Sequence, residues 1–276
     1  MEKDIKILIC VHKEVPLPEH PYFFPVQGGS DLAVSKLPYT QDNTGEHISF
    51  KNKNYCELTV HYWFWKNQKC DIVGLNHYRR YFDFFHKHPK YAPERSFDEI
   101  HSFLSRPYVF PDMEALLSDC DIVLPSKRHW PYKIATQYAI FHIVNDLNIL
   151  RDVIRDLTPD YLSAFDRFLY ADNAHSQYNM FITSWKYFDA YSEWLFKILF
   201  EVEKRLKISS YVDQARVFGY MSERLINVYV QKNRLKVKYL PVVMPVEKSE
   251  IGERLSNFRY TLRCLRNDLV FKYLKL

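Results

Sequence analysis

The sequence contains little glycine and no long apolar run. Only 6 of its 276 residues are glycine, which excludes collagen-like chains and flexible low-complexity linkers. No stretch approaches 18 consecutive apolar residues, so we expect no transmembrane helix. The N-terminal segment MEKDIKILICVHK lacks a long apolar core and a small-residue cleavage site, and it therefore does not resemble a signal peptide.

Cysteines are few, and their spacing does not suggest pairing. The number is odd and no two of them form a CxxC motif, which favours a reducing compartment and a cytoplasmic protein. The five are Cys10, Cys56, Cys70, Cys120 and Cys264.

The common nucleotide and hydrolase motifs are also missing. The sequence has no GxGxxG, GxxxxGK[ST], HExxH or GxSxG. Their absence disfavours classical dinucleotide enzymes, P-loop NTPases, zincins and α/β-hydrolases.

Aromatic residues are abundant, and the charge is unevenly distributed. With 21 Tyr, 20 Phe and 5 Trp, the chain is too rich in aromatics to be disordered. The net charge is +5, but residues 259–276 hold five basic residues and one acid. The remaining 33 basic and 32 acidic residues nearly cancel, so we expect no nucleic-acid partner, because duplex binding needs a broad basic field.

Short apolar runs separated by helical patterns predict an α/β fold. The runs at 5–11, 72–75 and 122–125 have the composition of buried strands, and helices between such strands favour a mostly parallel central sheet flanked by helices. A further strand is predicted at 179–183. Helices are predicted at 54–68, 135–155, 160–169, 191–202 and 213–231.

The C-terminal tail has a different pattern, and we divide the chain into a domain at 1–258 and a tail at 259–276. An apolar stripe with helical spacing predicts an amphipathic helix, basic on its flanks. We expect it to lie on the inner face of the cytoplasmic membrane. A helix packed on the domain or on a partner subunit is the alternative. The stripe consists of Leu262, Leu265, Leu269, Tyr273 and Leu276.

Two patterns could bind a metal, and we assign a metal site to neither. Asp119-Cys120-Asp121 matches the DxD signature of nucleotide-sugar transferases. It precedes its strand, however, whereas ligands bind outside the carboxyl ends of strands. His86 and His88 form a pair without an evident third ligand.

The ends of the first two predicted strands carry candidate ligand-binding groups. His77, Arg79 and Arg80 follow the strand at 72–75, and His12 and Lys13 follow the strand at 5–11. Adjacent guanidinium groups suit a diphosphate, because they bind its oxygens with paired donors. An ion-pair cluster that closes the strand is the alternative.

The loop at 42–49 combines short polar side chains with a glycine. Asp42, Asn43 and Thr44 could hydrogen-bond a ribose or another sugar. They could equally stabilise a self-bonded turn, since all three residue types favour turns.

Several blocks resemble a bacterial family, long catalogued as a domain of unknown function, that acts as a glycosyltransferase in capsule and O-antigen synthesis. They cover more than four-fifths of the chain, and the combination of DNTG with GLxHYRRYF is specific. The blocks are IKILICVHK (5–13), DNTGEHIS (42–49), NYCELTVHYWFWKN (54–67), DIVGLNHYRRYF (71–82), CDIVLP (120–125), YNMFI (178–182), YSEWLFKIL (191–199) and ARVFGYMSERL (215–225).

The resemblance implies a GT-A-like fold and transfer of a sugar from a UDP-sugar, with UDP-galactofuranose as the leading donor. The acceptor would be a growing or lipid-linked surface polysaccharide. No cofactor is firmly implied, although Mn²⁺ or Mg²⁺ would suit this chemistry. A non-catalytic module that binds carbohydrate or nucleotide is the alternative function.

Direct displacement by an acceptor hydroxyl needs a general base. Asp172 is one candidate, with a cap or turn role as its alternative. The other is the pair His142 and Asp146, whose i,i+4 spacing would place both on one helical face; an ordinary surface hydrogen bond is the alternative. Asn179 opens a predicted strand that could line the sugar pocket or lie at a sheet edge.

Overall fold

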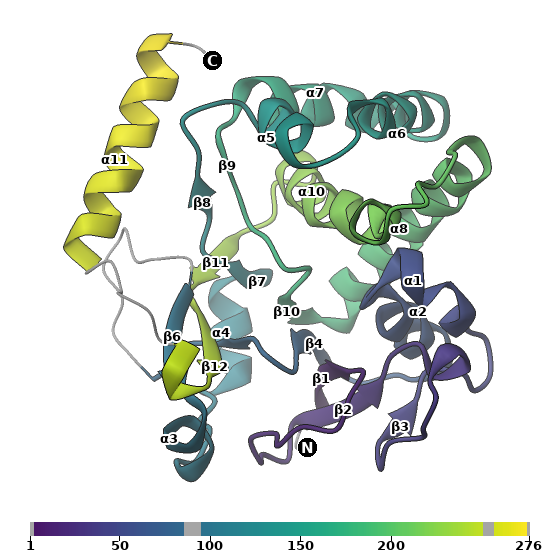
Figure 1. The fold of residues 1–276 in the computed structure, drawn as a ribbon, viewed down its shortest axis with the longest axis vertical. Coiled ribbons are helices and arrows are strands. Elements are labelled where there is room, and N and C mark those ends of the chain that lie inside the picture. Colours follow the sequence, from purple (N-terminus) through teal and green to yellow (C-terminus); the bar gives the residue numbers. More distant parts are fainter. Residues whose placement is uncertain (1–2, 86–94, 251–256, 275–276) are drawn as a thin grey trace.

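A seven-stranded sheet forms the centre of the computed structural model, which describes residues 3–85, 95–250 and 257–274 (Figure 1). The strand order is β11-β7-β10-β4-β1-β2-β3. Strand β10 is antiparallel to both neighbours, and the other pairings are parallel. The predicted mostly parallel sheet is therefore confirmed. The strands are β1 (Ile5–Val11), β2 (Phe23–Gln27), β3 (Thr40–Gln41), β4 (Ile72–His77), β7 (Ile122–Pro125), β10 (Phe181–Ser184) and β11 (Val237–Leu240).

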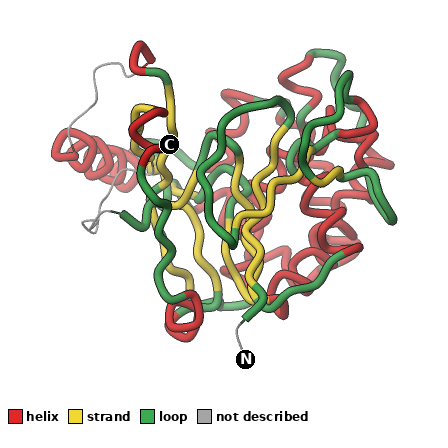
Figure 2. The backbone as a smooth tube through the Cα atoms, turned by 90° about the horizontal axis from the view of Figure 1, so that it is seen from below, coloured by secondary structure: helices red, strands yellow, loops and turns green. Residues whose placement is uncertain are grey.

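Strands β1 and β4 lie side by side in the middle of the sheet, where both faces of each strand are buried. This position suits their nearly continuous apolar sequences. Their parallel register places Cys10 opposite His77. The two strands therefore end together at one edge of the sheet. Figure 2 shows the strands running side by side through the molecule, with helices around them.

One face of the sheet packs on a thick helical layer, which holds the largest apolar cluster. Leu8, Leu75 and Leu124 point from the strands into side chains of α2, α8 and α10. The helices on this side are α1 (Asn52–Tyr55), α2 (Leu58–Asn67), α5 (Ile134–Phe141), α6 (Val144–Leu157), α7 (Leu162–Ala171), α8 (Trp185–Arg205), α9 (Val212–Ala215) and α10 (Val217–Lys232).

The opposite face is covered by smaller elements. Ile9 and Val11 of β1 pack there with aromatic residues such as Tyr81 and Phe103. The elements that cover this face are a three-stranded sheet of order β5-β12-β6 and two short helices. They are β5 (Tyr81–Phe82), β6 (Arg95–Glu99), β12 (Val242–Val246), α3 (Ile100–Ser105) and α4 (Met113–Asp119).

The prediction of a single helix at 135–155 is wrong, because this segment forms two helices, α5 and α6. His142 follows α5 with extended backbone angles (φ −140°, ψ 176°). Tyr138 and Leu147 are both buried in the core, yet at about 100° per residue they would lie on opposite faces of a continuous helix. The break lets both side chains reach the core.

Two other predicted boundaries also differ from the structure. The helix predicted at 54–68 is interrupted at Cys56, whose φ of 53° separates α1 from α2. Asn54 does not cap it, and its Nδ2 instead donates to the carbonyl of Ala215 at 2.8 Å. The strand predicted at 179–183 begins only at Phe181, because Asn179 has a left-handed φ of 53°.

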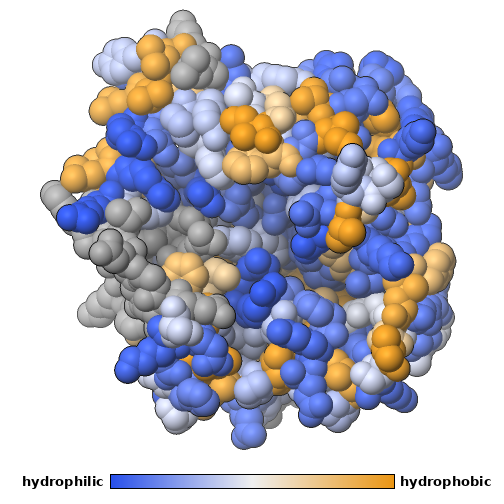
Figure 3. All heavy atoms as spheres, in the orientation of Figure 1, coloured by the Kyte–Doolittle hydropathy of each residue, from blue (hydrophilic) through white to orange (hydrophobic). Residues whose placement is uncertain are grey.

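The predicted C-terminal helix is confirmed as α11 (Asn257–Leu274). One side of α11, which carries the buried Tyr260, Cys264 and Asn267, packs on the domain. Asn267 Nδ2 donates to the carbonyl of His129 at 2.9 Å, and Asp268 Oδ1 lies 2.9 Å from His129 Nδ1. His129 belongs to β8 (Arg128–His129), which pairs with β9 (Ala174–His175). The described part of the apolar stripe faces outward (Figure 3), and Leu276 lies outside the described residues. Its exposed members are Leu262, Leu265, Leu269 and Tyr273.

Candidate functional site

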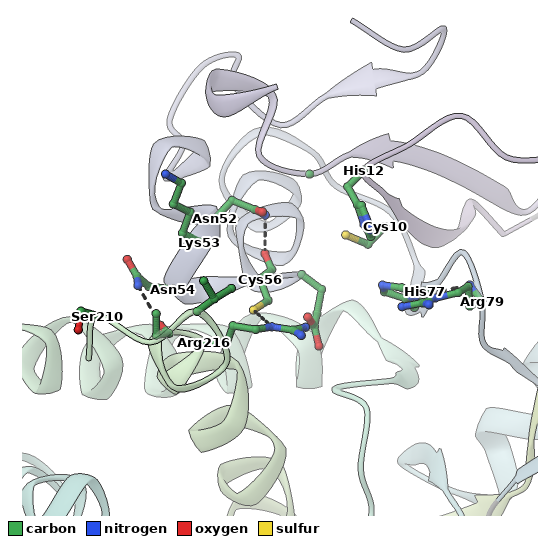
Figure 4. Close-up of a pocket in the computed structure, with 14 residues that line it drawn as sticks. Cys10, His12, Asn52, Lys53, Asn54, Cys56, His77, Arg79, Ser210 and Arg216 are labelled. Atoms are coloured by element: carbon green, nitrogen blue, oxygen red, sulfur yellow. Dashed lines mark hydrogen bonds between the residues drawn. The ribbon is translucent and has the colours of Figure 1, made fainter. Parts of the chain in front are cut away.

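A pocket of about 690 Å³ opens where β1 and β4 end, between these strands and the α9–α10 turn (Figure 4). Its volume is within the roughly 300–1,000 Å³ of small-molecule sites. The residues that line it are Cys10, His12, Gly28, Asn52, Lys53, Asn54, Cys56, Glu57, His77, Arg79, Ser210, Val212, Ala215 and Arg216.

The two predicted strand ends meet in this pocket. The ring centroids of His12 and His77 lie 6.1 Å apart, and Tyr78 contacts His12 edge-on at 4.9 Å. Gly28 lets the neighbouring loop approach closely, since a Cβ there would lie 3.1 Å from Cys10 Sγ. The structure therefore brings His12, His77 and Arg79 together, as the strand-end argument predicts.

Both histidines of the pocket are held neutral. Burial, followed by the charges of Arg80 and Arg79, lowers the pKa of His77 to about 2. Burial, Arg79 and Lys13 lower the pKa of His12 as well. The imidazoles therefore act as hydrogen-bonding groups near neutral pH. The positive charge of the pocket comes from Arg79, Arg216 and Lys53.

Arg79 and Arg216 come to the pocket from two distant parts of the chain, and the exposed Lys53 precedes the break between α1 and α2. Arg216 lies at the turn between α9 and α10, and its Nε donates to Cys56 Sγ at 3.3 Å. Lys13 and Arg80 lie outside the pocket lining. Lys13 Nζ lies 5.8 Å from the Tyr78 ring, and the Arg80 guanidinium stacks over Tyr178 at 4.7 Å.

Glu57 is the acid of the pocket, and Asn179 contacts it. Asn179 Nδ2 donates to Glu57 Oε1 at 2.8 Å and to the carbonyl of Gly219 at 3.1 Å. Asn179 itself is 5% exposed and precedes β10 at the same sheet edge. It does not belong to the pocket lining, so it reaches the site through Glu57.

The side chains of the loop at 42–44 bond to neighbouring residues of the chain, and none of the three residues lines the pocket. Asp42 is fully buried and accepts hydrogen bonds from the amides of Gly29 and Ser30 at 2.8 and 2.9 Å. Asn43 bonds to Asp31, and Thr44 accepts from the Trp63 indole. These bonds measure 3.0 and 2.9 Å. The loop therefore supports the segment around Gly28 next to the pocket.

The predicted bases lie elsewhere in the helical layer. His142 ends α5 and Asp146 lies in the first turn of α6, so the assumed shared helical face is wrong. The His142 ring instead packs on Tyr220 at 4.0 Å. Asp172 ends α7 next to Lys127, and burial raises the pKa of its carboxyl. None of the three lines the pocket.

The DxD sequence lies at the amino end of β7, as predicted. Asp121 accepts from the Tyr187 hydroxyl and the Lys236 amide, both at 2.7 Å, and so joins α8 to the segment before β11. Within 3–85, 95–250 and 257–274, no cluster of three His, Cys, Asp or Glu residues could hold a metal ion. His86 and His88 lie outside the described residues.

Residues 6–234 match the family model described as "Domain of unknown function (DUF4422)". The chain belongs to the DUF4422 family. A similar solved structure is the apo structure of the bifunctional glycosyltransferase WbbM, with a TM-score of 0.77 and 27% sequence identity. The match covers 92% of this chain and 48% of that one, so this chain spans about half the length of WbbM. Comparison with curated proteins gave no match.

Sequence reasoning missed two functional groups that this DUF4422 chain places in the pocket, Glu57 and Arg216. Neither residue follows a predicted strand, so the strand-end argument did not include them. Both lie in blocks that carry the family resemblance, 54–67 and 215–225. The polar residues of those blocks were the available signal.

Proposed function

We propose that this chain is a glycosyltransferase that uses a UDP-sugar donor. The observation that carries the proposal is the strand-end pocket, where Arg79 and Arg216 lie with His12 and His77. Guanidinium groups bind phosphate oxygens with paired donors, and a neutral imidazole can donate a further hydrogen bond. The 27% identity with the glycosyltransferase WbbM supports the same chemistry.

The leaving group in such a reaction is UDP, which gains negative charge as its bond to the sugar breaks. Fixed cations in a partly enclosed pocket stabilise that charge in the transition state. We propose that Arg79 and Arg216 serve this purpose, without a strict requirement for Mn²⁺ or Mg²⁺.

The donor sugar and the acceptor are proposed from the family resemblance. UDP-galactofuranose is the leading donor, and a growing or lipid-linked surface polysaccharide is the acceptor. A release assay with a panel of UDP-sugars tests the proposal directly. Sugar-dependent UDP formation supports it. Tight binding of UDP or saccharide, without turnover of any donor, would favour the non-catalytic module instead.

We also propose that α11 docks on the anionic inner face of the cytoplasmic membrane. The helix packs on the domain through Tyr260, Cys264 and Asn267, which leaves Leu265 and Leu269 41% and 54% exposed. Arg259, Arg266 and Lys272 are exposed on the same helix. Apolar residues beside basic ones suit an interfacial helix. Within the described segments, no helix has both the length and the apolar character to cross a bilayer.

A further inference from the structure

Glu57 is the only acid among the described residues that line the pocket. It lies at the N-terminus of α2 but makes no capping hydrogen bond there. The interruption at Cys56 ends α1 just before it. This carboxylate is therefore free of the local role that its position in the sequence suggests.

Only one oxygen of Glu57 is held by a side chain of the described chain. Asn179 Nδ2 donates to Oε1, and no described residue donates to Oε2. Asn179 is buried, and its own Oδ1 has no partner among the described residues. The amide thus orients the carboxylate and leaves one of its oxygens available to a ligand.

The backbone around this contact is strained on both sides. Cys56, Tyr178 and Asn179 have φ values of 53°, 78° and 53°, and none of them is glycine. Left-handed backbone at such residues persists where the surrounding structure enforces it, and it gathers at functional sites. Here the strain lies next to Glu57 on one chain segment and at its hydrogen-bond donor on the other.

We propose that Glu57 is the general base of the transfer reaction and that Asn179 is its positioning residue; this rests on the proposed function. The acceptor hydroxyl attacks the anomeric carbon, and its oxygen forms the new glycosidic bond. Its proton passes to Glu57 Oε2. The bond from the anomeric carbon to the β-phosphate oxygen breaks, and its electron pair leaves with UDP. Glu57 then returns the proton to solvent.

Several ionisable groups face Glu57, and they are relevant to any pH measurement. Arg216 lies on the α9–α10 turn and Glu223 on α10, and both interact electrostatically with Glu57. The thiols of Cys10 and Cys56 do so from β1 and from the α1–α2 break. His12 and His77 line the same pocket.

The test compares the full-length chain with Glu57→Gln and Asn179→Ala. The assay measures UDP release from a UDP-sugar with water or an octyl glycoside as acceptor. UDP affinity is measured separately by calorimetry. A general base contributes about 10²–10⁴-fold. We therefore expect kcat of Glu57→Gln to fall by that factor, with UDP affinity unchanged and the acidic limb of the pH–rate profile flattened. Asn179→Ala should lower kcat less and shift that limb.

Asp213→Asn is the matched control, because Asp213 is an exposed acid on α9 that does not line the pocket; it should keep full activity. Unchanged turnover by Glu57→Gln at every pH would overturn the inference while the transferase function stood. A sugar ester trapped on Glu57 and seen by mass spectrometry would make it a nucleophile and also overturn it. Absence of UDP release by the unmodified chain would instead reject the proposed function itself.

Discussion

Arg216 Nε lies 3.3 Å from Cys56 Sγ, although the two residues are 160 positions apart in the sequence. This contact joins the α9–α10 turn to the break between α1 and α2. It brings a second cation to the strand ends, where the charge of Arg216 helps to lower the pKa values of His12 and His77. The cationic pocket therefore depends on both the N-terminal strands and the distant helix.

Removing a pocket arginine should weaken UDP binding. A charge-assisted hydrogen bond contributes about 1.5–3 kcal/mol, so Arg79→Ala and Arg216→Ala should each raise the Kd for UDP by roughly 10- to 150-fold. Calorimetry measures the change. Arg151→Ala is the control, because Arg151 pairs with Asp166 in the helical layer. If the Kd stays the same when Arg79, Arg80 and Arg216 are all replaced, UDP binds elsewhere.

Chelation should leave the reaction running. In the proposed function, Arg79 and Arg216 offset the charge of the leaving diphosphate, and the DxD sequence lies at the amino end of β7. UDP release is therefore expected to continue at an undiminished rate after dialysis against EDTA. A complete loss that added Mn²⁺ or Mg²⁺ restores would show that a metal performs this role.

Acid should destabilise the fold through buried histidines, and His61 provides the clearest case. Its ring is 1% exposed and stacks on Phe188, and burial lowers its pKa to about 3. Unfolded histidine has a pKa of about 6.5, so below that pH the unfolded chain binds a proton that the folded chain does not. Stability should fall as the pH drops from 6.5 towards 3, by up to about 1.4 kcal/mol per pH unit.

The measurement is the free energy of unfolding in urea at pH 7 and pH 5. His61→Phe keeps the ring stack and removes the titration, so it should lose about 2 kcal/mol less than the unmodified chain between these two pH values. Replacement of the exposed His101 by Gln should leave the difference unaltered. An equal loss in His61→Phe would mean that His61 does not cause the acid sensitivity.

Membrane binding should depend on the outward stripe of α11. Leu265→Ser combined with Leu269→Ser removes exposed apolar side chains and leaves the side that packs on the domain, with Tyr260, Cys264 and Asn267, unchanged. The double variant should lose co-sedimentation with vesicles of anionic lipid. Leu32→Ser with Val34→Ser is the matched control, since these residues are also exposed but lie near the first strands. If the α11 double variant and the control variant co-sediment with the vesicles to the same extent, a membrane role for α11 is excluded.

The sequence by itself was sufficient to predict the central strands. The runs at 5–11, 72–75 and 122–125 are apolar apart from Lys6, and that pattern is typical of strands covered on both faces. It was also sufficient to predict that His12, His77 and Arg79 lie close together, because parallel strands place their carboxyl ends at one edge. The breaks between α1 and α2 and between α5 and α6 were not predicted. For the second break a signal was present, because Tyr138 and Leu147 are nine residues apart and would lie on opposite faces of one continuous helix.

Only the tertiary structure decided which polar groups face the pocket. Asp42 turned inward because the amides of Gly29 and Ser30 lie within its reach. Glu57 and Arg216 entered the pocket because two left-handed segments and the α9–α10 turn meet there. The apolar stripe of α11 faces outward because Asn267 and Asp268 bond to the domain and Tyr260 and Cys264 are buried. The periodicity of a segment indicates which of its residues can be buried. Which side chains face the pocket, and which side of α11 faces outward, depends on contacts with residues that are distant in the sequence.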